Sequence, residues 1–131
     1  MKNNLKIILI LLIANFFVSP DIKSQEIFNF NVTNIEISEN GNLFKGYDGG
    51  EANTNDGIKI IADKFEYNKL NTILSAEGNV FYEDTKKNII IEANEIIYVK
   101  KLETIKASGD EKIIDNFQKI ILTSENLEYS K

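Results

Sequence analysis

The chain has 131 residues, with no cysteine, no histidine, one proline and a formal net charge of −5. It therefore lacks a thiol nucleophile, an imidazole base and any disulfide. Its negative charge argues against nucleic-acid binding, which needs clustered basic residues to neutralise phosphates. We expect a binding or structural protein, not an enzyme, with no cofactor and no metal.

The first two dozen residues have the layout of a secretory signal peptide. Lys2 and Lys6 form a basic start, and residues 7–18 are an apolar run that only Asn15 interrupts. This run is too short to span a bilayer. We expect residues 1–24 to form a signal peptide helix cleaved after Ser24, with an uncleaved anchor as the alternative. Residues 25–131 then form one exported domain.

One apolar pattern occurs four times in the exported part. It reads apolar-x-apolar-x-small-x-x-apolar-x-apolar. The copies begin at Phe28, Ile58, Ile89 and Ile120, so successive copies are offset by 30, 31 and 31 residues. Apolar residues two apart face one side of a strand, and a fixed period of this length marks a repeat architecture. The pattern predicts an all-β fold built from strand repeats of roughly 31 residues.

The spacing within each copy changes after the small residue. Two positions pass before the next apolar one, so a straight strand would turn its apolar side outward. A bulge or corner, for example at residues 63–64 or 94–95, restores the facing. Gly78 and Gly109, one period apart, fall where such a strand has to bend sharply. We expect each repeat to be two short strands joined at a bend.

Three segments predict turns. Residues 41–57 are rich in glycine, asparagine and aspartate, which we interpret as turns around one short strand near residues 43–45. Residues 84–88 and 100–103 are typical of tight polar turns. The last repeat stops half way, at Tyr129. The domain therefore ends on an open sheet edge or continues in a longer protein.

Carboxylates are plentiful, yet their placement is that of a solvated strand face. Glu66 and Glu128, for instance, alternate with apolar residues. A catalytic carboxylate pair of the glycosidase kind is therefore a weak alternative. Asp48, Asp56 and Asp63 lie near glycines and could hold calcium in a loop, but the regular spacing of calcium-binding β-rolls is missing.

The apolar stripe supports two hypotheses. Its residues could pack on each other as the filled core of a sandwich or solenoid. Alternatively, the same inner face stays partly open and receives an apolar ligand. Large residues such as Phe65 alternate with small ones such as Ala62, which would give a groove uneven walls.

Two segments resemble the signature of the OstA-like domain family, which includes LptA and the N-terminal region of LptD. Residues 60–67, with Ile60, Ala62, Asp63 and Tyr67, are similar to the family's I-x-A-D-x-x-x-Y motif, and residues 74–80 are similar to its L-x-A-x-G-N-V motif. Residues 92–98 and 107–110 repeat both motifs less strictly. The resemblance extends over residues 28–131.

The resemblance implies an open β-jelly-roll in the periplasm that shelters lipopolysaccharide acyl chains and takes part in outer-membrane assembly. It also implies stacking through edge strands, either with related domains or with copies of itself. Whether the chain is LptA-like or the front of an LptD-like protein stays open. The residues expected to line the acyl groove are Ile60, Ala62, Phe65, Tyr67, Leu74, Ala76, Val80, Ile91, Ala93, Ile96, Tyr98, Ile105 and Ala107.

Two other functions compete with lipid transport. The first is a structural β-solenoid with a filled core, which binds another protein through its edge strands and takes no lipid. The second is an exported carbohydrate-active enzyme, which predicts an acidic pair facing a cleft.

Overall fold

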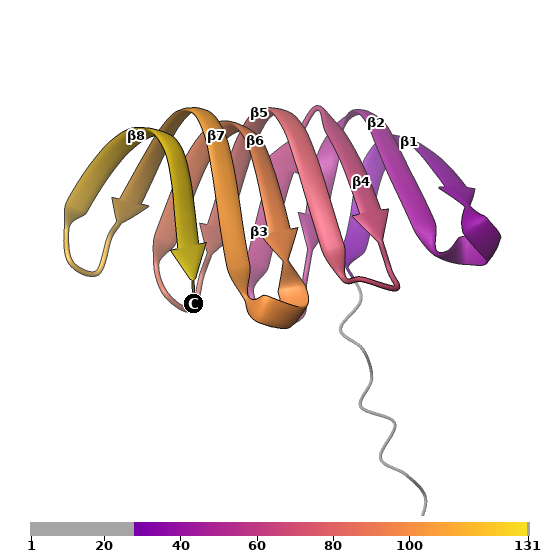
Figure 1. The fold of residues 1–131 in the computed structure, drawn as a ribbon, viewed down its shortest axis with the longest axis horizontal. Coiled ribbons are helices and arrows are strands. Elements are labelled where there is room, and N and C mark those ends of the chain that lie inside the picture. The colour runs from indigo at the N-terminus through magenta and orange to yellow at the C-terminus, as the bar shows by residue number, and fades with distance from the viewer. Residues whose placement is uncertain (1–27, 131) are drawn as a thin grey trace, which may run out of the picture.

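The computed structural model describes residues 28–130, which form a single antiparallel β-sheet (Figure 1). The signal peptide expected at residues 1–24 lies outside the described residues. The strands are β1 (Asn29–Ser38), β2 (Leu43–Asn53), β3 (Ile58–Ala62), β4 (Lys64–Asn68), β5 (Ile73–Asp84), β6 (Ile89–Val99), β7 (Thr104–Asp115) and β8 (Ile120–Ser130). Two short 3-10 helices, η2 (Glu39–Gly41) and η3 (Lys100–Leu102), join β1 to β2 and β6 to β7.

The sheet is a meander with the strand order β1-β2-β3-β5-β6-β7-β8. β3 and β4 both lie between β2 and β5, because they are the two halves of one strand that is interrupted at Asp63. β1 and β8 are therefore the two edges of the sheet.

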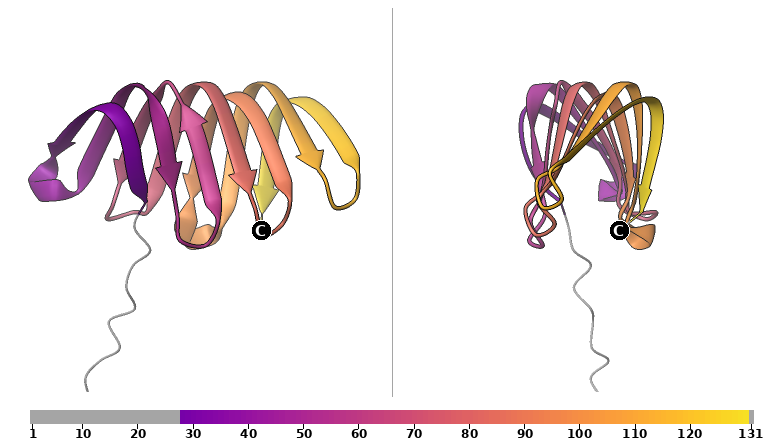
Figure 2. Two further views of the ribbon diagram at one scale, coloured as in Figure 1. Left: turned by 180° about the vertical axis from the view of Figure 1, so that it is seen from behind. Right: turned by 90° about the vertical axis from the view of Figure 1, so that its left-hand side faces the viewer.

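Each long strand bends near its middle, so the sheet folds over into a trough (Figure 2). The strand pairing shifts register at these bends: between Glu77 and Val80, between Glu92 and Glu95, and between Ser108 and Glu111. A bulge of this kind lets the inward side of the strand stay apolar on both sides of the bend. The expected open β-jelly-roll is confirmed.

Gly78 and Gly109 lie at two of these bends, as predicted. Their φ angles are +81° and +84°, which side-chain-bearing residues rarely adopt. A Cβ on Gly78 would also lie 2.4 Å from the Asp63 side chain, and one on Gly109 would lie 2.6 Å from Asn94. Glycine is therefore required both by the backbone angle and by the close approach of the neighbouring strand.

The bend divides the trough into two walls. Wall A comprises residues 34–38, 43–47, 64–68, 73–77, 95–99, 104–108 and 126–130, and wall B comprises residues 29–32, 50–53, 58–62, 80–84, 89–93, 111–115 and 120–124. Turns join the free ends of the walls in two rows, seen at the bottom of the right-hand view of Figure 2. We name these rows lip A (residues 39–42, 69–72 and 100–103) and lip B (residues 54–57, 85–88 and 116–119), and the side of the trough between them the mouth.

Side chains from the two walls meet inside the trough. Phe30 of wall B stacks on Phe44 of wall A with ring centroids 6.2 Å apart, and Tyr82 of wall B meets Tyr98 of wall A edge-on at 6.1 Å. The inward stripe of the two middle repeats forms one hydrophobic cluster, to which Phe28, Phe30 and Val32 of the first repeat and Leu127 and Tyr129 of the last one add. The remaining stripe residues on the edge strands, among them Ile35, Ile37 and Leu122, are exposed. Burial of the cluster holds the folded sheet closed, because apolar area is removed from water on both walls at once.

Two sequence expectations were wrong in detail. Residues 43–53 form one long strand, β2, instead of a short strand among turns. Gly50 is required because β2 passes close to β1: a Cβ there would lie 2.5 Å from the Asn31 carbonyl oxygen. Gly49 is favoured by its φ angle of +82°. The second error concerns the repeats, which are single bent strands except for β3 and β4, since a bulge absorbs the change in spacing without ending the strand. The turns expected at residues 84–88 and 100–103 are confirmed.

Candidate ligand-binding trough

All thirteen residues expected to line an acyl groove lie inside the trough. Twelve of them are at most 4% exposed, and the thirteenth, Ala93, is 9% exposed. These side chains are therefore buried between the two walls. The walls touch each other in this conformation, so an apolar ligand has to separate them or displace side chains. The filled-core alternative predicts the same packing.

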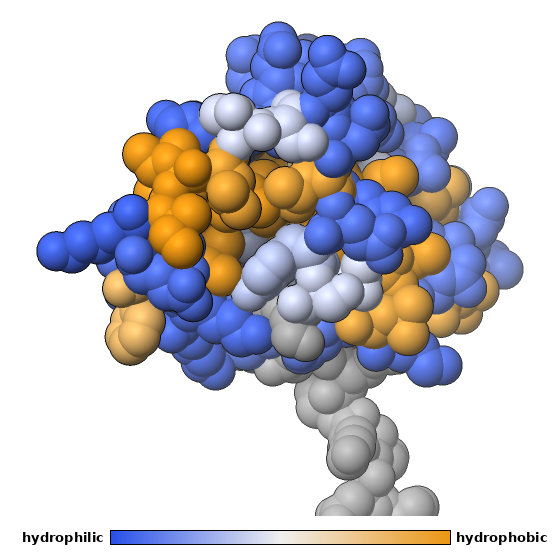
Figure 3. Space-filling view, turned by 60° about the vertical axis from the view of Figure 1, so that its left-hand side comes forward, coloured by the Kyte–Doolittle hydropathy of each residue, from blue (hydrophilic) through white to orange (hydrophobic). Residues whose placement is uncertain are grey.

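The two ends of the trough are apolar and exposed. On edge strand β1, Ile35 and Ile37 are 50% and 55% exposed, and on edge strand β8, Leu122 is 55% exposed. Figure 3 shows hydrophobic side chains gathered over the end formed by β8. Large apolar side chains along an unpaired strand edge are typical of a surface that another strand covers.

Two tyrosine hydroxyls are buried near the mouth without a hydrogen-bond partner. Tyr82 and Tyr98 are both 0% exposed, and neither hydroxyl oxygen has a partner among residues 28–130. Burial raises the pKa of Tyr98 to about 12 and raises the pKa of Tyr82 well above its ordinary value. Both hydroxyls are therefore neutral at pH 7 and free to donate a hydrogen bond into the trough.

An ion pair joins the two lips across the mouth. Lys100 in η3 of lip A pairs with Asp56 in the β2–β3 turn of lip B, and their side chains are only 12% and 21% exposed. The Thr54 hydroxyl donates to the Asp56 carboxylate and fixes it in the turn. The Lys100 ammonium also lies 5.9 Å from the centre of the Tyr98 ring, within the range of a cation–π contact.

The sequence interpretation missed two inward carboxylates. Glu111 is 1% exposed and lies at the bend of β7, where neither of its oxygens has a hydrogen-bond partner in the described part of the chain. The repeat spacing could have predicted the position of Glu111, because Glu111 follows the inward residue Val80 by one repeat period. Asp84, at the end of β5, is equally buried, and its Oδ1 accepts the backbone N–H groups of Lys86 and Lys87 at 3.0 and 3.1 Å. Asp84 therefore shapes the β5–β6 turn.

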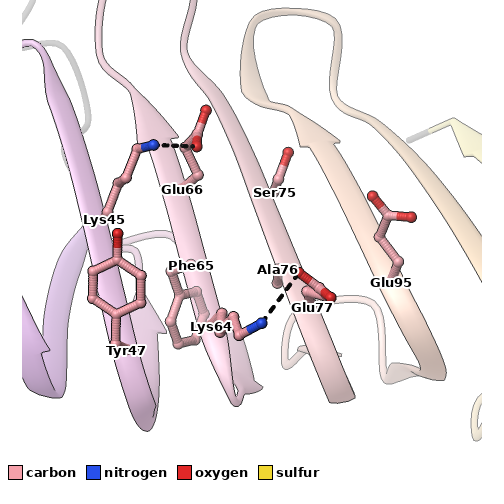
Figure 4. Close-up of a pocket in the computed structure, with 9 residues that line it drawn as sticks. All are labelled: Lys45, Tyr47, Lys64, Phe65, Glu66, Ser75, Ala76, Glu77 and Glu95. Carbon is pink, nitrogen blue, oxygen red and sulfur yellow. Dashed lines mark ion pairs between the residues drawn. The ribbon is translucent and has the colours of Figure 1, made fainter.

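Lysines on the outer face of the sheet pair with glutamates on neighbouring strands. Figure 4 shows a shallow depression on this face in which Lys45 pairs with Glu66 at 3.3 Å and Lys64 with Glu77 at 3.9 Å. A hydrogen bond from Lys45 to Glu66 raises the Lys45 pKa. These carboxylates face lysines and solvent, as the predicted solvated face requires.

The three aspartates considered for calcium make local contacts instead. Asp48 accepts a hydrogen bond from Asn34 at 2.7 Å, Asp63 accepts one from Asn79 at 2.9 Å, and Asp56 forms the ion pair across the mouth. Within residues 28–130, no three histidine, cysteine, aspartate or glutamate side chains are grouped as metal ligands. The same residues include no helix with the length and hydropathy to cross a membrane.

The fold and the trough place the described residues in the LptA-like β-jelly-roll class of folds. One similar solved structure is the crystal structure of LptH from Pseudomonas aeruginosa, described as the LptA-homologous periplasmic component of the conserved lipopolysaccharide transport device. The similarity has a TM-score of 0.70 at 12% sequence identity, and it covers 80% of this chain and 76% of LptH. No family model and no curated protein matches the sequence.

Proposed function

We propose that the chain is a periplasmic component of lipopolysaccharide transport and outer-membrane assembly. In this proposal the trough shelters the acyl chains, and the strand edges stack against related domains or further copies of the chain. The observation that carries it is the unbroken apolar inner face, which reaches both ends of an LptA-like fold. Export through a signal peptide at residues 1–24, and a domain over residues 25–131, are part of the proposal.

Sheltering the acyl chains avoids a large free-energy cost of exposing them to water. Each exposed CH₂ group costs about 0.8 kcal/mol, so an acyl chain of a dozen carbons costs on the order of 10 kcal/mol. Opening the trough is much less costly than exposing its core, because contacts between the walls are replaced by contacts with the acyl chain. Small side chains such as Ala62, Ala76 and Ala107 leave the inner walls uneven, which favours a flexible ligand.

The edge strands provide the stacking surface. Pairing β8 of one domain with β1 of the next would extend the sheet and continue the trough across the junction. It would also bury the exposed side chains of Ile35, Ile37 and Leu122. Unpaired edges are normally an aggregation hazard, so long exposed apolar edges fit a chain that is meant to be paired there.

Photocrosslinking tests the sheltering of acyl chains. A photoreactive residue replaces inward Phe65 or Ile96, or outward Glu66 as the matched control from the same wall. Each variant is expressed in cells that make lipopolysaccharide, and its folding is checked by circular dichroism. We expect lipopolysaccharide to be captured at Phe65 and Ile96 and not at Glu66. Equal capture at all three positions rejects the assignment.

The closed interior favours one second candidate, a β-solenoid interaction module with a filled core. An apolar fluorescent dye, displaced by lipid, separates the two functions. A transport domain binds the dye while folded and releases it to lipopolysaccharide. A filled core binds the dye only at denaturant concentrations that unfold the sheet.

A further inference from the structure

Lysines on the walls and lysines on the lips differ in their partners. Each lysine on the outer face of the walls pairs with a glutamate on a neighbouring strand, at distances from 3.3 to 3.9 Å. These face lysines are Lys45, Lys59, Lys64, Lys106 and Lys112. Of the lip lysines, only Lys100 has an ion-pair partner, whereas Lys69, Lys86, Lys87, Lys101 and Lys119 make no ion pair within the described part of the chain.

Positive charge is therefore concentrated around the mouth. The lips and the strand ends beside them carry six lysines and five carboxylates, whereas the other described residues carry five lysines and thirteen carboxylates. Two of the five carboxylates at the lips are Asp84 and Asp115, whose Oδ1 atoms accept backbone N–H groups of the turns. A third, Asp56, pairs with Lys100. A negatively charged group would find unpaired lysines at the mouth, and carboxylates in excess on the outer faces.

Apolar side chains accompany the lip lysines. Leu70 follows Lys69 and is 69% exposed, Leu102 follows Lys101 and is 69% exposed, and Phe117 in the same turn as Lys119 is 83% exposed. Apolar and basic side chains in alternation are suited to the boundary between a hydrocarbon chain and its polar headgroup.

Just inside the mouth, the Tyr82 and Tyr98 hydroxyls lack partners while fully buried. A buried hydroxyl without a hydrogen bond costs free energy, which a ligand can remove by supplying a polar atom at the same place. The carbonyl or hydroxyl groups that join a headgroup to its acyl chains have the required chemistry.

We propose that the mouth is a headgroup site for an acylated amphiphile that carries phosphate or carboxylate groups. The unpaired lip lysines bind the anionic groups, and the Tyr82 and Tyr98 hydroxyls bind polar atoms at the start of the acyl chains. This inference rests on the proposed function, because it requires acyl chains to occupy the trough. It adds the charge of the headgroup and the residues that recognise it.

The test compares two amphiphiles of equal chain length, dodecyl phosphate and dodecyl maltoside. Binding to the full-length chain is measured by calorimetry below the micelle concentration. The lip variant combines Lys69→Gln, Lys86→Gln, Lys87→Gln and Lys101→Gln. The matched face variant combines Lys45→Gln, Lys64→Gln, Lys106→Gln and Lys112→Gln, which changes the net charge equally. Circular dichroism establishes that both variants are folded.

We expect the lip variant to bind dodecyl phosphate about tenfold more weakly, since each screened surface charge contributes only a few tenths of a kcal/mol. The face variant should stay within about twofold of the wild type, and neither variant should change dodecyl maltoside binding. High salt should remove the wild-type preference for dodecyl phosphate.

Six results overturn the inference. Equal weakening in both variants would mean that only net charge matters, and no weakening in the lip variant would exclude the lysines. Inorganic phosphate binding as tightly as dodecyl phosphate would show that the acyl chain plays no part. Binding to anionic vesicles without binding of monomeric dodecyl phosphate would make the lips a membrane-docking surface. If the wild type binds neither amphiphile, both lipid sheltering and the headgroup site are rejected. If it binds dodecyl maltoside as tightly as dodecyl phosphate, the headgroup site alone is rejected.

Discussion

The side chains of Lys100 and Asp56 form an ion pair that connects the two walls of the trough at the mouth. These residues are 44 positions apart in the chain and lie on opposite lips. A ligand that enters through the mouth therefore has to separate this pair as well as the apolar side chains behind it.

Asp56→Ala should destabilise the empty protein and speed ligand exchange. The substitution removes the ion pair between Asp56 and the mostly buried Lys100 charge, which should lower the free energy of unfolding by about 1 to 2 kcal/mol. Urea denaturation measures the loss, and stopped-flow dye release measures the exchange rate. Glu66→Ala, which removes the exposed Lys45–Glu66 pair, serves as the control and should leave the urea midpoint nearly unchanged, because solvent screens an exposed ion pair. Equal losses in the two variants would show that the lips are not held by the Lys100–Asp56 pair.

Tyr82→Phe should stabilise the empty protein. The substitution removes a buried hydroxyl that has no hydrogen-bond partner and keeps the ring contact with Tyr98. A gain of about 1 kcal/mol corresponds to a rise of about 4 to 8 °C in the melting temperature of a domain of this size. Tyr67→Phe is the matched control. Tyr67 is also buried, but unlike Tyr82 it does not have a buried hydroxyl that lacks a hydrogen-bond partner. A lower melting temperature for Tyr82→Phe would mean that its hydroxyl is satisfied in solution.

Stability should fall steeply above pH 10. In the unfolded chain a tyrosine loses its proton near pH 10, whereas burial raises the Tyr98 pKa to about 12 in the folded chain. Between these pH values the unfolded state binds fewer protons, so each such tyrosine should lower the free energy of unfolding by about 1.4 kcal/mol per pH unit. Urea denaturation at pH 9, 10 and 11 measures the slope, and Tyr98→Phe should reduce it. Titration of all tyrosines near pH 10 in the folded protein would contradict the burial.

Glu111→Met should raise stability, unlike most substitutions of buried residues. The variant keeps the length of the side chain and replaces a buried carboxylate without hydrogen bonds by an apolar group, at the position where the preceding repeat has Val80. We expect a gain of about 1 to 3 kcal/mol in urea denaturation. The outward variant Glu128→Met should change stability by less than about 0.5 kcal/mol. A loss in Glu111→Met would indicate that the carboxylate has a partner in solution.

The repeat spacing predicted an all-β fold of bent strand repeats, because a period of two along each strand and a slip at each bend leave few arrangements of the chain. The open β-jelly-roll itself was predicted from the resemblance to the OstA-like family. The bends at Gly78 and Gly109 followed from local backbone requirements alone. The sequence did not predict the long strand β2, because a glycine that permits the close approach of β1, such as Gly50, cannot be told in the sequence from a glycine in a turn. The Lys100–Asp56 pair and the unpaired lip lysines depend on how distant turns line up in space, which repeat spacing does not specify.

Spin-label distances between the walls test most directly whether the closed trough opens for acyl chains. The chain has no native cysteine, so labels at Lys59→Cys on wall B and Lys106→Cys on wall A are unique. With saturating lipopolysaccharide we predict that the distance grows by about 4 Å, the width of one hydrocarbon layer, whereas labels at Lys64→Cys and Lys106→Cys on the same wall keep their distance. An unchanged distance between the walls at saturation would contradict the sheltering of acyl chains inside the trough.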